Sequence, residues 1–305
     1  MSLNSKRFWR AAAMMGCSSL CLAGTAALIL TPPRAAEAQG PHPVQIAVAT
    51  QAVAPALAEA TVGFADGAKL TGSVSFSDDF KALAPLVAKG GSTKDPAVCG
   101  ASEEIPNEEL VVNPENKGIA NVFVFLPKAP TGYKAPKADK ELIFDQKNCK
   151  FLPHSLCIQV GQTVKVLSDD GVPHNTHTFP LRNAGFNQTV SPNDRKGVEL
   201  KYSKAEKLPI EVKCDFHTWM KAYHLILDHP FMAVSDANGK FEIEGLPAGK
   251  HEFTVWHEKK GYLDKKLAVE VKAGESKSVD LKYGAKQFAT FEGPQPKSTV
   301  VSLTK

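Results

Sequence analysis

A seven-residue segment holds the residues with the most distinctive chemistry. It begins at Cys214, passes through His217 and ends at Met220, and His174 lies forty residues upstream. Two imidazoles, a thiolate and a thioether are the donors of a mononuclear copper site with a trigonal His₂Cys set and a weak axial methionine. Sulfur ligands favour Cu(I) and imidazoles also hold Cu(II), so a compromise geometry lets one electron move with little rearrangement. The donor types therefore predict a redox-active copper site.

Other metal sites remain open on the residues alone. Zinc could use Cys214 with the two histidines if His177 served as the fourth ligand, because closed zinc sites prefer four Cys and His ligands. A purely structural role for the segment is the other alternative. The chain lacks the paired H-x-H motifs of a trinuclear copper cluster and the C-x-x-x-C motif of a binuclear copper site.

The remaining histidines are weaker candidates. His229 and His257 could form a second metal site, although such residues more often satisfy hydrogen bonds in turns. His154 precedes a short apolar run and is expected to form hydrogen bonds within a loop.

Short alternating runs around the candidate ligands predict strands. Residues 162–167, 198–202 and 210–213 alternate polar and apolar side chains, and Gly, Pro, Asn and Asp cluster between them. Cys214 directly follows the last of these runs. The segment from Cys214 to Met220 therefore suits a strand-to-strand loop that curls around one metal, with His174 arriving from a neighbouring loop. The mature chain shows no helical period of useful length, so we expect an all-β sandwich.

The motifs resemble those of the cupredoxin family. C-x-x-H-x-x-M at 214–220 is similar to the ligand loop of amicyanin, and Pro173-His174-Asn175 is similar to the P-H-N of amicyanin and plastocyanin. The run from Phe151-Leu152-Pro153 to Val166 resembles the strands that precede the first cupredoxin histidine. The match covers residues of about 150–228. Phe216 and Trp219 within the loop depart from the family pattern.

The resemblance implies a cupredoxin-type Greek-key β-sandwich around residues 141–228. It implies one mononuclear Cu(I)/Cu(II) ion with four ligands: His174, Cys214, His217 and Met220. The implied function is one-electron transfer between a protein donor and a protein acceptor, with no enzymatic reaction. In the family, the residue that corresponds to Asn175 ties the two ligand loops together. The rival interpretation is a non-redox copper- or zinc-binding, or structural, β-sandwich protein of the cell envelope.

A second β unit is expected over residues 229–283. Its D-x-x-G-x-F…L-P-x-G pattern, from Asp236 to Gly249, resembles the transthyretin-like, carboxypeptidase-regulatory module. This unit lacks opening strands, and the early alternating runs at 70–76 and 120–126 are too few to bury a core alone. Our hypothesis is that the early strands complete the late unit and that the copper domain is inserted between them. The expected segments are a signal peptide (1–38), a flexible lead-in (39–67), early strands and loops (68–140), the copper domain (141–228), the second unit (229–283) and a loose tail (284–305). The early segment ends in a Pro- and Lys-rich stretch at 127–140.

The N-terminus has the features of a secretory signal. A basic start is followed by a charge-free stretch from Ala11 to Leu30 and a small-residue cleavage site at Ala36-Glu37-Ala38. We therefore expect a periplasmic or secreted protein, attached to a membrane only if the signal stays uncleaved as an anchor. Removal of residues 1–38 lowers the net charge from +4 to +1, so charge gives no case for nucleic-acid binding.

Four cysteines remain after residue 38, and an oxidising compartment allows disulfides. Cys214 is needed as a metal ligand, and Cys157 alternates as an inward strand residue. The two loop cysteines, Cys99 and Cys149, are therefore predicted to form a disulfide.

Overall fold

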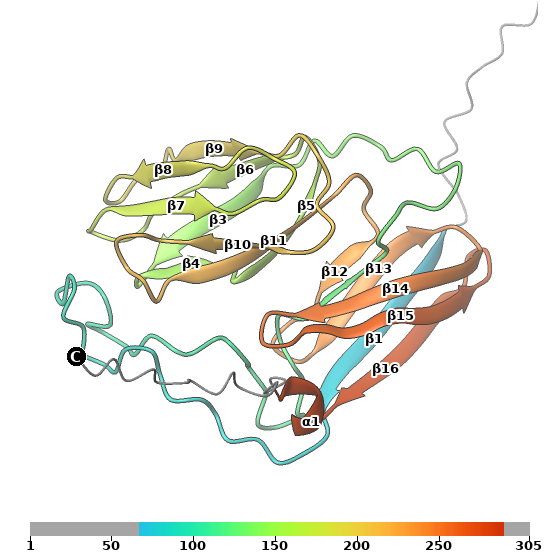
Figure 1. Ribbon diagram of the computed structural model, residues 1–305, viewed down its shortest axis with the longest axis horizontal. Helices are drawn as coiled ribbons and strands as arrows, with labels where there is room; N and C mark the ends of the chain where they lie inside the picture. Colours follow the sequence, from blue (N-terminus) through green and yellow to red (C-terminus); the bar gives the residue numbers. More distant parts are fainter. Residues whose placement is uncertain (1–66, 290–305) are drawn as a thin grey trace, which may run out of the picture. The chain divides into compact units, whose positions relative to one another are not determined.

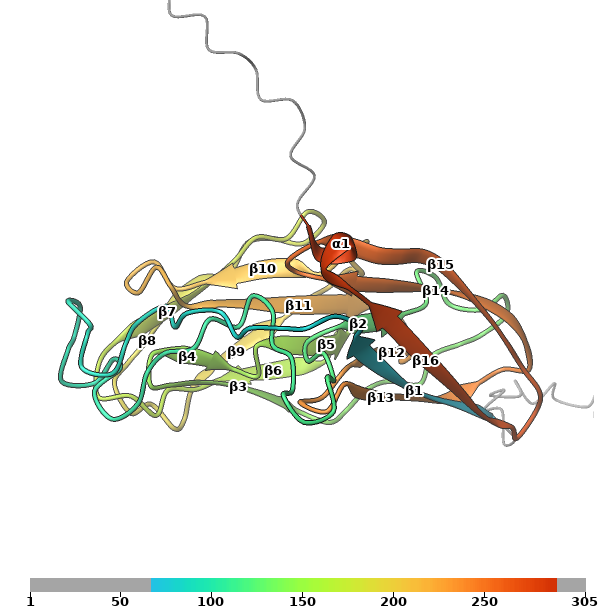
Figure 2. The same ribbon diagram turned by 90° about the horizontal axis from the view of Figure 1, so that it is seen from below.

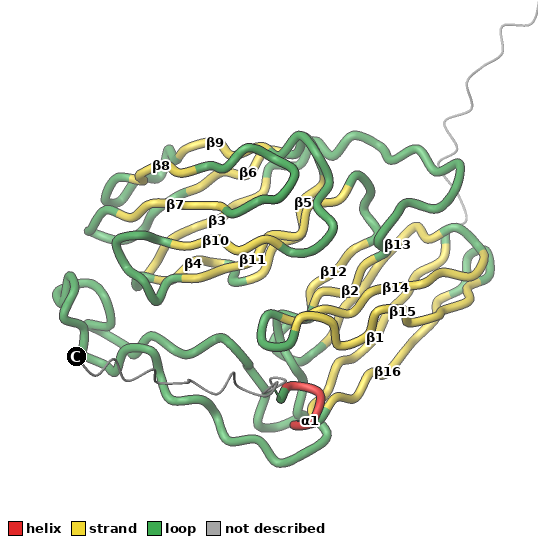
Figure 3. Tube along the Cα trace, in the orientation of Figure 1, coloured by secondary structure: helices red, strands yellow, loops and turns green. Residues whose placement is uncertain are grey.

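The computed structural model describes residues 67–289, and these residues form two groups of β-sheets (Figure 1). Figure 3 shows how strand dominates over helix in the described chain. The strands are β1 (Ala68–Phe76), β2 (Phe123–Phe125), β3 (Leu142–Lys147), β4 (Lys150–Leu152), β5 (Ser155–Gln159), β6 (Thr163–Val166), β7 (His174–Thr178), β8 (Asn187–Val190), β9 (Val198–Lys201), β10 (Ile210–Lys213), β11 (Lys221–Leu227), β12 (Met232–Val234), β13 (Lys240–Leu246), β14 (Gly249–His257), β15 (Gly261–Val271) and β16 (Ser276–Tyr283), and one short helix follows, α1 (Ala285–Phe288). The expected all-β sandwich fold is confirmed.

The strands from β3 to β11 form the sandwich that contains the candidate ligands. One sheet has the order β5-β11-β10-β7-β8 and the other has the order β4-β3-β6-β9. The alternation in the sequence becomes an alternation in burial. In β10, Ile210 and Val212 are buried, whereas Glu211 and Lys213 are only partly buried. Val164 and Val166 of β6 lie in the same apolar core. The apolar face of each strand thus fixes which side chains meet between the sheets.

The remaining strands form the second sandwich. Its sheets have the orders β13-β1-β16 and β12-β2-β14-β15. β1 runs antiparallel to β13 and parallel to β16, while β2 lies between β12 and β14. Strands from before and after the ligand-bearing sandwich therefore share the same sheets, which is the pairing that the insertion hypothesis requires. Figure 2 shows β1 between β13 and β16 from a second direction.

A tight turn between β12 and β13 depends on glycine. The Asp236 carboxylate accepts hydrogen bonds from the backbone N–H groups of Asn238 and Lys240, 2.8 Å each. Gly239 follows with a φ of 73°, and a Cβ there would lie 2.2 Å from the carbonyl oxygen of Val74. Only glycine allows β1 to approach this turn so closely.

Residues 285–288 differ from the loose tail that the sequence predicts. We expected a loose tail from residue 284, but residues 285–288 form α1 and Phe288 is buried. Its ring packs 5.9 Å from the ring of Phe76 and 5.3 Å from that of His257. Burial of the Phe288 ring therefore fixes this segment against the sheet, although the residues around it are mostly polar or small.

The signal peptide and nearly all of the lead-in lie outside the described residues, as does the rest of the tail. Within residues 67–289, no helix has the length and apolar character needed to cross a membrane.

The predicted disulfide is confirmed. Cys99 and Cys149 are bonded to each other, with their Cα atoms 5.2 Å apart and 50 residues between them in sequence. Cys214 is a free, buried thiol, and Cys157 is a free, half-buried thiol in β5.

Candidate metal centre

Strand pairing brings the candidate ligands to one end of the sandwich. His174 is the first residue of β7, and Cys214 directly follows β10. β10 pairs antiparallel with both β7 and β11, so the 214–220 segment is a loop between adjacent strands and the start of β7 lies beside it. This is the arrangement that the spacing predicts.

Three of the predicted ligands converge. The Nδ1 atoms of His174 and His217 are 3.0 Å apart, and the Cys214 Sγ lies 4.0 Å and 3.8 Å from them, respectively. Both histidines are fully buried and Cys214 is 2% exposed. A metal about 2.0–2.1 Å from nitrogen and about 2.3 Å from sulfur spans donor separations of roughly 3.3–3.8 Å. The measured separations, from 3.0 to 4.0 Å, lie close to this range, so small shifts would let the three atoms bind one metal ion.

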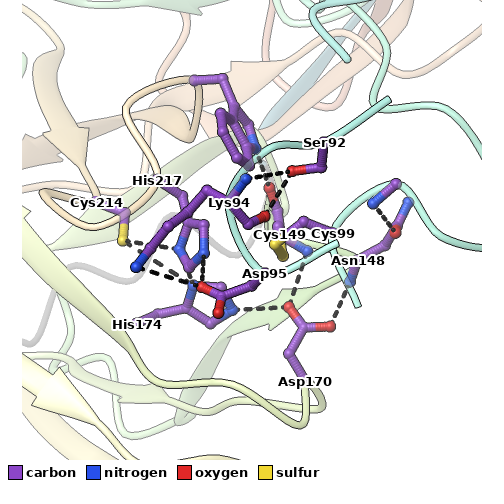
Figure 4. The surroundings of a disulfide bond; sticks show 12 residues. Ser92, Lys94, Asp95, Cys99, Asn148, Cys149, Asp170, His174, Cys214 and His217 are labelled. Carbon is purple, nitrogen blue, oxygen red and sulfur yellow. Dashed lines mark hydrogen bonds and ion pairs between the residues drawn. A yellow bond between two sulfur atoms is a disulfide. The ribbon is translucent and has the colours of Figure 1, made fainter. Parts of the chain in front are cut away.

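The outer edges of both imidazoles face carboxylates. His174 Nε2 lies 2.8 Å from Asp170 Oδ2, and His217 Nε2 lies 2.9 Å from Asp95 Oδ2 (Figure 4). A carboxylate accepts, so each Nε2 carries a proton. The Nδ1 atoms face each other and the sulfur, so their lone pairs would repel one another with no cation between them. A cation among them, whether a proton or a metal ion, removes this repulsion, so the donor set fits a metal.

The thiol of Cys214 is prepared for ligation. Burial pushes the pKa of Cys214 upward, but hydrogen bonds with His174, with His217 and with the backbone outweigh burial and lower the pKa to about 6. The thiolate is therefore the main form at neutral pH, and the thiolate is the form that binds metal.

The fourth predicted ligand, Met220, is buried in the same apolar core as Cys214. Its backbone N–H donates to the carbonyl of His217 at 2.8 Å, and its carbonyl accepts from the N–H of Cys214 at 3.3 Å. These two bonds close the loop into a compact turn that carries all three residues. The ligation of a metal by Met220 stays a prediction.

Asn175 links the two segments that carry the ligands. Its Oδ1 accepts from the N–H of Asp215 at 2.6 Å, and its Nδ2 donates to the Asp215 carboxylate at 2.7 Å and to Asn187 Oδ1 at 2.8 Å. The structure thus places Asn175 where the family resemblance expects it.

His177 points away from the candidate ligands. Alternation along β7 places His174 and Thr176 on one face and Asn175 and His177 on the other. The His177 ring contacts the Asp215 carboxylate at 3.1 Å, and its side chain is 30% exposed. His177 is therefore not positioned as a fourth zinc ligand.

The other singled-out histidines are buried and do not gather around a metal. His154 pairs with Glu258, and His229 Nδ1 accepts from the N–H of Phe231 at 3.2 Å. His257 is also fully buried. Among the described residues, each group of three or more metal-binding side chains that could share one ion includes His174 or His217.

The two aromatic residues of the loop differ in environment. Trp219 is half-buried and its Nε1 donates to the carbonyl of Cys149 at 3.1 Å, while its ring lies 5.3 Å from that of His217. Phe216 is 43% exposed. Trp219 therefore contributes to packing around the site, whereas Phe216 faces solvent.

The carboxylates at the site were not singled out in the sequence. Asp170 lies in a turn four residues before His174, which is a local signal that could have indicated it. Asp95 is 122 residues from His217 and carries no such signal. The proximity of the disulfide was also unexpected: a ring nitrogen of His217 lies within 4.8 Å of both of its sulfurs.

Comparisons with known proteins give partial similarities. No family model matches the chain, and no curated protein matches it. Among solved structures, a copper-containing nitrite reductase from Thermus scotoductus is 17% identical with a TM-score of 0.26, and the match covers 33% of this chain and 25% of the reductase. A purple cupredoxin from Nitrosopumilus maritimus is 24% identical with a TM-score of 0.24, covering 29% of this chain and 100% of the cupredoxin. A reduced amicyanin variant is 21% identical with a TM-score of 0.26, and the match covers 34% of this chain and 98% of the amicyanin.

These structural neighbours are copper proteins, and the chain spans a quarter of the nitrite reductase. At such low scores they carry no argument about function, which rests on the site itself. The resemblance of residues 229–283 to transthyretin-like modules stays a prediction.

Proposed function

We propose that this protein is an exported type 1 copper protein that transfers single electrons between redox partners. One observation carries the proposal: two imidazole Nδ1 atoms and a cysteine sulfur, all buried, converge at the spacing of a single metal. His174, His217 and Cys214 would hold the copper, with Met220 as a fourth, weaker ligand. When bound, copper supplies the one-electron Cu(I)/Cu(II) couple.

The protein contributes rigidity. The hydrogen bonds of Asn175 fix the ligand loop against β7, and the backbone bonds of Met220 fix the loop itself. Side chains held in this way cannot rearrange easily when the charge of the site changes. Such resistance to rearrangement lowers the cost of electron transfer and suits a redox role better than storage.

The alternative is a non-redox copper- or zinc-binding protein. A closed zinc site prefers four Cys or His ligands. The structure brings together only three of the candidates, because His177 lies on the opposite face of β7. A methionine beside a His₂Cys set is typical of copper rather than zinc. The geometry thus favours copper.

The remaining parts of the proposal follow from the sequence. The signal-like N-terminus supports a periplasmic or secreted location, with membrane attachment only through an uncleaved anchor. The near-neutral mature charge supports protein partners rather than nucleic acid. We assign the protein no enzymatic reaction.

A redox titration of the copper-loaded full chain tests the function. The proposal expects the visible absorption to disappear on reduction and to return on oxidation, with a single one-electron midpoint. If copper binds tightly in one oxidation state but is released, or changes its stoichiometry, during each cycle of reduction and oxidation, the result would support the storage alternative instead.

A further inference from the structure

A loop from the N-terminal part of the chain covers the candidate metal centre. We call residues 87–105 the covering loop; an isolated bridge between Val87 and Ile105 joins its ends. Asp95 lies within it, with a φ of 49°, and its carbonyl accepts from the N–H groups of Val98 and Cys99 at 2.9 Å each. These bonds orient the Asp95 side chain toward His217 Nε2.

The covering loop is fastened beside the site by the disulfide. Cys99 belongs to the loop and Cys149 belongs to the ligand-bearing sandwich. A second bond supports the same junction, since the N–H of Gly100 donates to Asn148 Oδ1 at 3.2 Å. The disulfide therefore holds Asp95 close to its imidazole.

The same junction orients the other carboxylate. Asp170 is 4% exposed, and its Oδ2 accepts from the N–H of Cys149 at 2.8 Å as well as facing His174 Nε2. Its Oδ1 accepts from the N–H of Asn148 at 2.6 Å. One half of the disulfide thus fixes Asp170 and the other half fixes the segment that carries Asp95. Figure 4 shows both carboxylates near the disulfide, each facing one of the two imidazoles.

This arrangement closes the outer edges of both ligand rings. His174 and His217 are fully buried, whereas the Asp95 side chain is 31% exposed. Asp95 is therefore the outer layer between His217 and solvent. A carboxylate on the distal nitrogen fixes the tautomer and orientation of an imidazole ligand and raises its basicity.

We propose that Asp95 and Asp170 are positioning residues for the two imidazoles and that the disulfide-fastened covering loop shields the copper from small exogenous ligands. This inference rests on the proposed copper function. Two carboxylates beside the ligands also favour the more positive oxidised metal, so they lower the reduction potential. The shielding and the charge effect can be tested separately.

The charge effect is tested with Asp95→Asn in the copper-loaded full chain. The amide oxygen can still accept from His217 Nε2, so the visible spectrum should persist while the reduction potential rises. Asp169→Asn is the matched control. Asp169 precedes Asp170 in sequence, but its carboxylate lies at the surface and pairs with Lys147 at 2.8 Å. This control should shift the potential much less. Equal shifts in both variants would show that Asp95 has no special role.

The shielding is tested by titration with sodium azide, followed in the visible and electron paramagnetic resonance spectra. The wild type should not respond, whereas Asp95→Gly and the double variant Cys99→Ser/Cys149→Ser should both develop azide-dependent bands. Asp95→Gly keeps the disulfide and accepts the positive φ, so it gives a result even if the double variant does not fold. Azide binding by the wild type as tightly as by Asp95→Gly would overturn the inference.

Different results would contradict the proposed function and the proposed role of the covering loop. A wild type with no visible copper band contradicts the proposed function itself. If the wild type shows a visible copper band and reversible reduction while its reduction potential and azide response do not depend on Asp95, that result contradicts only the proposed roles of Asp95 and the covering loop.

Discussion

His224 makes the stability of this protein depend on pH. It lies in β11 and is fully buried, with its ring 4.6 Å from that of Phe144. Its Nδ1 is 3.0 Å from the hydroxyl of Tyr202, and its Nε2 has no hydrogen-bond partner within residues 67–289. Burial lowers the pKa of His224 to about 3.

The size of the effect follows from the difference between the folded and unfolded pKa values. An unfolded histidine binds a proton below a pKa of about 6.5, while the folded His224 stays neutral down to about 3. The stabilising contribution of the neutral form is therefore complete above about pH 6.5 and is lost as the pH falls toward 3. Between pH 7 and pH 5 this loss is about 2 kcal/mol of unfolding free energy.

Urea unfolding at pH 7 and pH 5 measures the loss. In His224→Phe, the decrease in stability between the two pH values should be smaller than in the wild type by about 2 kcal/mol. Tyr202→Phe is the control, because it removes the same hydrogen bond but keeps the imidazole. It should lower stability at both pH values and retain the wild-type dependence. If His224→Phe kept the full wild-type dependence, the assignment of the effect to burial of His224 would be refuted.

Four further changes have defined outcomes. Replacing both Cys99 and Cys149 by serine should lower the unfolding free energy by about 4 kcal/mol, because a loop of this length is no longer closed; an unchanged urea midpoint would contradict this. Asn175→Ala should cost about 1–3 kcal/mol and speed the loss of bound copper, since the N–H of Asp215 loses its acceptor; a wild-type dissociation rate would argue against its linking role. Met220→Gln should keep the copper but shift its reduction potential, and an unshifted potential would remove Met220 from the ligand set. The isolated fragment 229–305 should be unfolded by circular dichroism, because β13 and β16 are neighbours only of β1 in their sheet; cooperative unfolding of a soluble monomer would disprove the insertion hypothesis.

The elements that sequence reasoning identified are those with local signals. Alternation at 163–166 and 210–213 is visible in the sequence because half-buried strands have a period of two residues. The ligand loop could be found because its three donors lie within seven residues and follow directly after a strand. The disulfide could be inferred because few cysteines remained to be paired.

The features that were missed depend on contacts between distant segments. Asp95 approaches His217 from 122 residues away in sequence, beside the disulfide that joins the covering loop to Cys149, and nothing near Asp95 in sequence indicates this contact. Phe288 is buried because the chain returns to the second sandwich after β16, so its polar neighbours were misleading. Neither the burial of His224 nor its hydrogen bond with Tyr202 has a local signal, since both depend on how the two sheets pack.

The visible absorption spectrum of the copper-loaded full chain tests the central claim most directly. A thiolate bonded to Cu(II) in a His₂Cys site should give strong absorption in the visible region, and Cys214→Ser should abolish it. His177→Ala should leave the spectrum nearly unchanged, because that side chain faces away from the site, whereas His174→Ala should bleach it. The reverse result for the two histidines would overturn the ligand assignment. A wild type that takes up only zinc, and stays colourless after copper loading under oxidising conditions, would contradict the electron-transfer function.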